Sequence, residues 1–187
     1  MEEKVKAKTS TEVRTIHVKW CYPKPEKQLC DFEKGYIAGI IDGEGNIRII
    51  KSKPGKRSKY LTLSPQISIK NCSKELMQKC RGILEIGKIS LYRYKTRISK
   101  KWRPCYELRV IRLNEVLWLL ENIGEHLIVK KRQAHLLLEF LNLRRKATRT
   151  MVVDRTSKKI VAQKGSGYTK RALEIFEEIK TGYVRKI

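Results

Sequence analysis

Two acidic residues beside a row of glycines are the residues of this sequence best suited to metal chemistry. Asp42 and Glu44 are separated by Gly43, and Gly35, Gly39 and Gly43 recur at intervals of four. Glycines at this spacing form one stripe of a helix, although each interior glycine costs about 1 kcal/mol relative to alanine. Such a stripe is typical of a helix that approaches a second helix closely.

The expected partner is the same helix of a second copy, because the glycine-rich segment occurs once in the chain. A twofold axis at this seam would bring two Glu44 carboxylates together, and carboxylates at close range repel each other. A hard divalent cation such as Mg²⁺ relieves that repulsion and also binds phosphate oxygens. Paired sites of this sort serve phosphodiester hydrolysis. The alternative interpretation is a capping acid on a glycine-rich turn. The residues expected at the dimer interface are Gly35, Ala38, Gly39 and Asp42.

The charge of the chain points to a polyanionic partner. The 187 residues include 43 Lys and Arg but only 19 Asp and Glu, which gives a formal net charge of +24. Basic residues are spread along the whole chain, so we expect a working surface that faces nucleic acid. The alternative is a heat-adapted surface without a nucleic-acid partner. Such surfaces add Glu along with Lys, whereas acidic residues are scarce in this chain. No apolar run approaches the roughly 18 residues of a membrane span, so no membrane partner is expected.

The acids must be positioned by a mixed α+β core. The segment 32–43 is expected to be a helix with Asp31 as its cap, Phe32, Tyr36 and Ile40 on its apolar stripe, and glycines at its end. Alternation and capping residues then predict the remaining strands and helices. Strands are expected at 46–51, 61–69, 88–95 and 105–111, and helices at 74–84, 113–122, 130–145 and 170–180. This order predicts an antiparallel sheet saddle with helices packed on one face.

One face of that sheet should be polar and available for reading DNA. A β-ribbon fits the major groove, where Arg can bind guanine and Gln can bind adenine through paired hydrogen bonds. A strand of about eight residues rises roughly 26 Å, which corresponds to about 8 bp. The DNA-binding residues expected on this face are Asn46, Arg48, Ile50, Thr62, Ser64, Gln66, Ser68, Ser90, Tyr92, Tyr94, Glu107 and Arg109. At any single position, a solvated strand surface remains the alternative.

The cysteines indicate a reducing compartment. Their number is five, and the first residues of the chain lack the apolar segment of a secretory signal. We therefore expect an intracellular protein of a prokaryotic cytoplasm, a chloroplast or a mitochondrion. None of the cysteines forms a C-x-x-C pair and the three histidines do not complete a zinc spacing, so no structural zinc is expected.

The segment Ile37–Gly45 resembles the LAGLIDADG motif of homing endonucleases, in a variant that ends D-G-E-G. The element order is similar to the single-motif, homodimeric branch of that family. The segments Pro65–Ile69, Ile86–Ile89 and His126–Ala134 resemble further family elements, the last of them a K-x-x-Q-A helix. The resemblance covers roughly residues 31–145.

This resemblance implies an intron-encoded, metal-dependent DNA endonuclease that works as a homodimer on a long, near-palindromic site. It implies that Glu44 binds Mg²⁺ or another divalent cation such as Mn²⁺, and that Gly43 offers its backbone carbonyl. It further implies that Asn71 orients water and that Lys130 stabilises the pentavalent phosphate. The sequence departs from the family at Glu44, where the motif has Asp, and at Asn71, where many members have Gln.

Two other functions stay open at this stage. A maturase that binds intron RNA, or a DNA-binding regulator, could keep the same fold without cutting, although retention of Glu44 disfavours both. A basic structural RNA-binding protein would not need a glycine-lined helix that leads into an acidic turn. The expected organisation is a basic, irregular extension over 1–30, an endonuclease core over 31–145, and a basic linker with a C-terminal helix over 146–187.

Overall fold

A computed structural model of the chain describes residues 13–18, 23–52, 62–92, 104–146, 149–154, 160–165 and 168–181. The predicted order of core elements is confirmed, and the fold is an α+β fold with an antiparallel sheet of four strands. The elements of the core are α1 (Asp31–Glu44), β2 (Gly45–Ser52), β3 (Thr62–Asn71), α2 (Lys74–Leu84), β4 (Lys88–Tyr92), β5 (Cys105–Val110), α3 (Leu113–Ile123), a 3-10 turn (Gly124–His126), α4 (Lys131–Lys146) and α5 (Lys170–Thr181). Within the described ranges, no helix is long and apolar enough to cross a membrane.

The four-stranded sheet has the order β2-β3-β5-β4, with every neighbouring pair antiparallel. Its apolar face carries alternate residues of the strands, such as Ile47 on β2, Ile67 on β3 and Leu108 on β5, each at most 1% exposed. These side chains join one hydrophobic cluster with buried residues of all five helices. The helices therefore cover a single face of the sheet, and the opposite face keeps the polar half of each alternation.

The helix α1 begins one residue earlier than its sequence suggests. Its N-cap is Cys30, whose backbone N–H donates to the Glu33 carboxylate at 3.0 Å, so the prediction of Asp31 as the cap is wrong. The Gly45 N–H makes the last helical hydrogen bond, to the Ile41 carbonyl, and the helix ends at Glu44 because the backbone of Gly45 is extended. A Cβ at Gly45 would lie 2.6 Å from that carbonyl oxygen, so only glycine fits this close turn into β2.

The buried stripe of α1 differs from the predicted one. Ile37, Ala38 and Ile41 are at most 1% exposed, whereas Phe32 is 75% exposed and stacks on Tyr36. Phe32, Tyr36 and Ile40 are also spaced as one face of a helix. The stripe that the helix turns toward the core is instead the one with Ile37, Ala38 and Ile41. Ser73 caps α2 and Thr169 caps α5, since each side-chain oxygen accepts a backbone N–H of the following helix.

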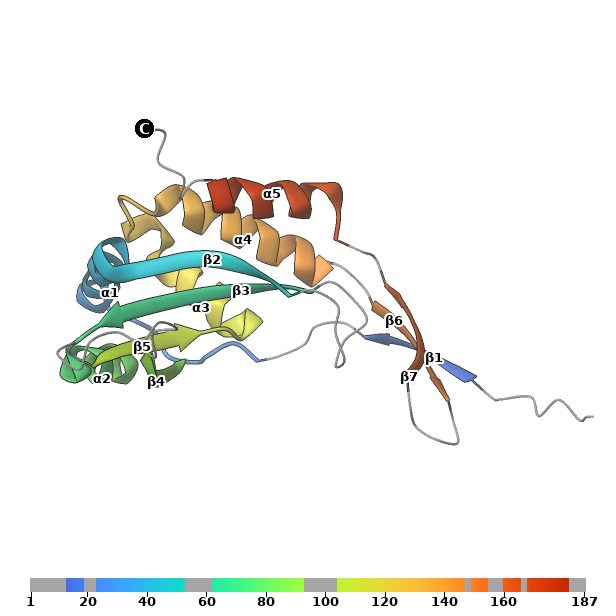
Figure 1. Ribbon diagram of the computed structural model, residues 1–187, viewed down its shortest axis with the longest axis horizontal. Coiled ribbons are helices and arrows are strands. Elements are labelled where there is room, and N and C mark those ends of the chain that lie inside the picture. Colours follow the sequence, from blue (N-terminus) through green and yellow to red (C-terminus); the bar gives the residue numbers. More distant parts are fainter. Residues whose placement is uncertain are drawn as a thin grey trace, which may run out of the picture.

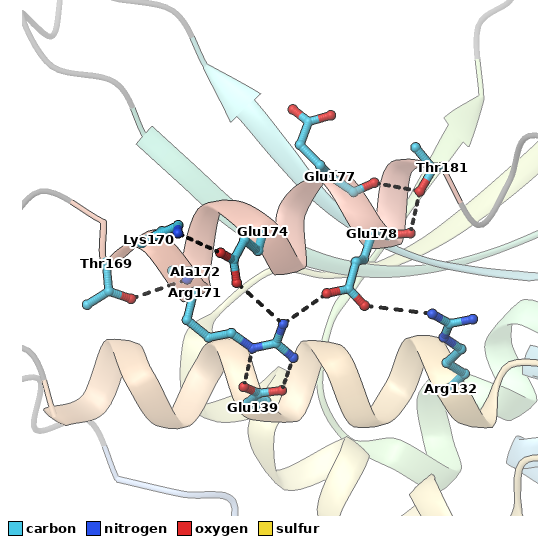
Figure 2. A network of polar contacts seen from close by, with 10 residues as sticks. All are labelled: Arg132, Glu139, Thr169, Lys170, Arg171, Ala172, Glu174, Glu177, Glu178 and Thr181. Atoms are coloured by element: carbon cyan, nitrogen blue, oxygen red, sulfur yellow. Dashed lines mark hydrogen bonds and ion pairs between the residues drawn. The ribbon is translucent and has the colours of Figure 1, made fainter.

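The C-terminal helix α5 is part of the core. Four of its residues, Ala172, Ile175, Phe176 and Ile179, belong to the buried cluster. Figure 2 shows the polar contacts that fix it to α4: Arg171 binds both carboxylate oxygens of Glu139 at 2.7 and 2.9 Å. A third contact joins Arg171 to Glu178 at 2.9 Å. Paired guanidinium–carboxylate bonds set orientation as well as distance, so α5 has a defined position along α4.

A second sheet contradicts two expectations about the flanking segments. The strand β1 (Val13–Val18) pairs with β6 (Arg149–Asp154), which pairs with β7 (Ile160–Gly165), all antiparallel. The interpretation of 1–30 as irregular is therefore wrong for residues 13–18, and the linker expected after residue 146 contains a hairpin. Figure 1 places this sheet beyond the far ends of β2 and β3, at the end of the molecule opposite α1.

Candidate nucleic-acid interface

The polar face of the four-stranded sheet gathers the residues that the sequence assigns to DNA reading. In the register, Asn46 lies opposite Ser68, Ser68 opposite Arg109, and Arg48 opposite Gln66. On the other side of β5, Ser90 lies opposite Glu107. The remaining predicted residues in described strands are Ile50, Thr62, Ser64 and Tyr92. Only the prediction for Tyr94 falls outside the described residues.

Three further polar residues share this face and are absent from the sequence prediction. Lys70 lies opposite Glu107, Lys88 lies opposite Arg109, and Ser52 lies opposite Thr62. Each lies two residues along its strand from the nearest predicted DNA-binding residue, and therefore on the same face of the sheet. Extending the alternation to the true strand ends would have found all three.

The middle of the polar face is more deeply buried than a solvated surface. Gln66, Ser68 and Glu107 are each 1% exposed. Several side-chain atoms here lack a hydrogen-bond partner: Asn46 Oδ1, Arg48 Nε, Gln66 Nε2, Ser68 Oγ and Glu107 Oε1. Buried polar atoms without partners are costly and uncommon. Atoms buried this deeply do not reach bases directly, so the accessible side chains of the face, such as Arg48 and Arg109, are the ones placed to meet base edges.

Helix α5 borders this face along the edge strand β2. A groove of about 320 Å³ lies between them, with Arg48 and Lys51 on the strand and Phe176 and Lys180 on the helix. The Lys51 ammonium lies 5.7 Å above the Phe176 ring. On the opposite side, beyond β4, a hollow of about 520 Å³ is lined by four basic residues, Arg81, Lys88, Arg109 and Arg112, with Glu85 and Glu115. Both borders of the polar face thus carry positive charge.

Asp42 binds its own chain. Its carboxylate accepts the backbone N–H of Ile128 at 2.7 Å and that of Lys130 at 2.9 Å. Burial alone would raise the pKa of the Asp42 carboxyl. Hydrogen bonds from the N–H groups of Ile128, Lys130 and Val129, together with the Lys130 charge, instead hold that pKa below its usual range. Asp42 therefore joins the end of α1 to the beginning of α4, a role that the sequence did not reveal.

The three residues expected to act in catalysis lie at one end of the sheet. Glu44 is the exposed last residue of α1. Gly45 pairs with Ile69, which places Asn71 at the same end, and the Asn71 side-chain oxygen accepts the Ser73 N–H at 2.8 Å. The Lys130 ammonium donates to the backbone carbonyl of Asp42, two residues before Glu44.

The donor set at this end suits a hard cation. Glu44 supplies a carboxylate, and Gly43 lies in the last turn of α1, where carbonyls lack partners within the helix. The negative end of the helix dipole also favours a cation there. Among the described residues, no group of three or more His, Cys, Asp and Glu side chains could hold a metal.

The outer face of α1 is open along its glycines. A Cβ added to Gly35, Gly39 or Gly43 would meet nothing within 4 Å. Two residues expected at a dimer interface face inward instead: Ala38 is 1% exposed within its own core, and Asp42 binds the N–H groups of Ile128 and Lys130. The chain therefore leaves the glycine stripe free for a second helix, while Ala38 and Asp42 are occupied by internal contacts.

Comparisons with known proteins agree with this geometry. The family model of the LAGLIDADG-like domain matches residues 31–124. The fold is similar to the I-LtrWI LAGLIDADG homing endonuclease bound to target DNA (TM-score 0.54, 15% identity), with 86% of this chain and 47% of that chain covered. It is also similar to the homing endonuclease I-TnaI, with a TM-score of 0.53 and 17% identity; the match covers 79% of this chain and 85% of that chain. A third similar structure is the homing endonuclease I-CvuI in complex with a DNA target in the presence of Mg. Its TM-score is 0.51 at 13% identity, and the match covers 80% of this chain and 95% of that chain. No curated protein matches the sequence significantly.

Proposed function

Since this chain belongs to the LAGLIDADG-like domain family, we propose that it is a homing endonuclease that cuts both strands of DNA at a long, near-palindromic site. The observation that carries the proposal is the open glycine stripe of α1, which leads into the exposed Glu44 beside a polar sheet face with accessible Arg48 and Arg109 side chains. The net charge of +24 suits a DNA partner.

The chain acts as a homodimer in this proposal. The glycine stripes of two copies pack together, and the exposed side chains of Phe32, Ile128 and Val129 add apolar surface beside it. The coverage of similar structures supports this arrangement. The chain matches 95% of the I-CvuI chain but only 47% of the I-LtrWI chain, which has room for two such units.

Each copy contributes Glu44 and the Gly43 carbonyl to a divalent cation, Mg²⁺ or Mn²⁺. The bound cation supplies charge stabilisation at the reacting phosphate. Lys130 keeps its ammonium at the end of α1 through the Asp42 carbonyl, where it can neutralise phosphate charge. The Asn71 oxygen is occupied by the Ser73 N–H, which leaves its amide N–H groups to orient water.

Sequence is read by the polar face of the sheet. Its rows run across the strands, so Asn46 and Arg109, on either side of the buried Ser68, meet the same region of the groove. Basic side chains at the two borders bind phosphates and set affinity without reading sequence. The source is a prokaryotic cytoplasm or an organelle, which suits the four free cysteines of the described residues.

Replacement of one carboxylate tests the proposal. Glu44→Gln keeps the size of the side chain and removes its charge, so we expect unchanged DNA affinity and a loss of cleavage of roughly 100-fold or more. The matched control is Glu33→Gln on the same helix, which should cut at the wild-type rate. The readouts are gel-shift affinity and plasmid cleavage with Mg²⁺. Wild-type cleavage by Glu44→Gln would refute the assigned role.

A further inference from the structure

A buried carboxylate occupies the middle of the polar face. Glu107 is 1% exposed, between Lys70 on β3 and Ser90 on β4. A face that is to approach DNA phosphates gains nothing in affinity from an acid, and burial of a carboxylate is costly unless it is paired. The position of Glu107 therefore requires a physical explanation.

The ion pairs of Glu107 supply that explanation. Its Oε2 accepts a short hydrogen bond from Arg109 Nη2, and its Oε1 lies 4.0 Å from the Lys70 ammonium. Glu107 itself is nearly inaccessible, whereas the side chains of Arg109 and Lys70 are 44% and 34% exposed. The carboxylate is thus a buried anchor for two exposed cations.

Arg109 keeps most of its hydrogen-bonding capacity in this arrangement. A guanidinium has five N–H donors in a rigid plane, and Glu107 is the polar partner of Arg109 within the described residues. A free pair of donors held at a fixed angle suits the O6 and N7 acceptors of guanine. Without the anchor, the same side chain could turn toward a phosphate, which carries no sequence information.

We infer that Glu107 is a positioning residue for sequence specificity: it fixes Arg109 to read one guanine in each half of the DNA site. The inference rests on the proposed DNA-binding function and deepens it. The row of Asn46, Ser68 and Arg109 begins two residues after Glu44 along β2. Two residues at a rise of about 3.4 Å and two strand spacings of about 4.8 Å place Arg109 roughly 12 Å from Glu44, so the guanine lies about three to four base pairs from the cut.

The test measures base preference with a randomised duplex library. Wild-type protein, Glu107→Gln, Arg109→Gln and the double variant are each used to enrich bound DNA. We expect Arg109→Gln to abolish a guanine preference at one position of each half-site. Glu107→Gln should weaken that preference roughly tenfold and raise affinity for unrelated DNA. The control Glu115→Gln alters another Glu–Arg pair, with Arg112 at 3.2 Å, and should keep the wild-type profile.

The double variant separates positioning from simple structural support. If Glu107 acts through Arg109, its replacement has no further effect on base preference once Arg109 is Gln. The inference would be overturned if Glu107→Gln changed base preference as much in the Arg109→Gln background as in the wild-type background. It would also be overturned if Glu107→Gln alone left the guanine preference unaltered. A uniform loss of affinity across all sequences would also overturn it. Failure of the wild-type protein to cut any DNA would count against the proposed function instead.

Discussion

The contact of Asp42 with the segment before α4 leads to a prediction about stability. The carboxylate accepts two backbone N–H groups, from Ile128 at 2.7 Å and Lys130 at 2.9 Å. A hydrogen bond to a charged group contributes about 1.5–3 kcal/mol. The N–H of exposed Ile128 can bind water when the carboxylate is removed, so the lower half of the range applies. Two bonds in the lower half of that range contribute about 3–4 kcal/mol together, so Asp42→Ala should lower the free energy of unfolding by that amount.

Thermal denaturation measures this loss directly. For a domain of this size, about 1 kcal/mol corresponds to a shift of about 2–4 °C in Tm. Asp42→Asn, which keeps one acceptor oxygen, should lose less than Asp42→Ala. Asp31→Asn is the matched control: among the described residues, its carboxylate at the other end of α1 binds the Lys34 side chain and no backbone N–H, so Tm should hardly change. A Tm for Asp42→Ala equal to that of the control would refute the reasoning.

The same contact predicts a dependence on pH. Because the folded-state pKa of Asp42 lies below the ordinary value of 3.8, its stabilisation is fully present above that value. It is lost as the pH falls through the lower, folded-state pKa. The difference in stability between wild-type protein and Asp42→Asn should be constant above pH 5 or so and shrink in stronger acid. A difference that instead grew in acid would contradict the assignment.

Two further predictions concern the glycine stripe and the attachment of α5. Gly39→Ala should stabilise the monomer by about 0.5–1 kcal/mol, because the added methyl enters open space in a helix. It should also weaken the dimer, and sedimentation over a range of concentrations measures that change; an unaltered dimer affinity would contradict the proposed seam. Tyr168→Phe removes the hydroxyl that accepts the Leu63 N–H at 2.6 Å. It should cost about 1–2 kcal/mol in urea unfolding, and a change below about 0.5 kcal/mol would argue against this contact.

Local patterns predicted most of the core because they follow the forces that form it. The alternation around Gln66 appears in β3, and Ser73 caps α2 as its side chain and position indicate. The sheet of β1, β6 and β7 could not be predicted in this way. Its first strand pairs Val13 with Asp154, and no local signal connects segments so far apart in the sequence. The division into extension, core and C-terminal region remains a prediction, although α5 packs into the core.

The candidate site was predictable in its membership but not in its internal contacts. Period-two alternation assigned Glu107 to the polar face, yet alternation contains no information about how deeply a residue on that face is buried. The donors to Asp42 come from Ile128 and Lys130, which only the folded chain brings near. The spacing of Ala38 with Gly35 fitted a common interface, but Ala38 is rotated by about 100° from the neighbouring Gly39 around the helix axis, which turns it toward the core.

The central claim is that this chain cuts DNA with a metal bound near Glu44. The most direct measurement incubates the full chain with a randomised duplex-DNA library, with and without Mg²⁺, and sequences the cut ends. The account predicts cuts that require the metal and that share one long, near-palindromic sequence. Binding without cuts at any sequence in the presence of Mg²⁺ would contradict it.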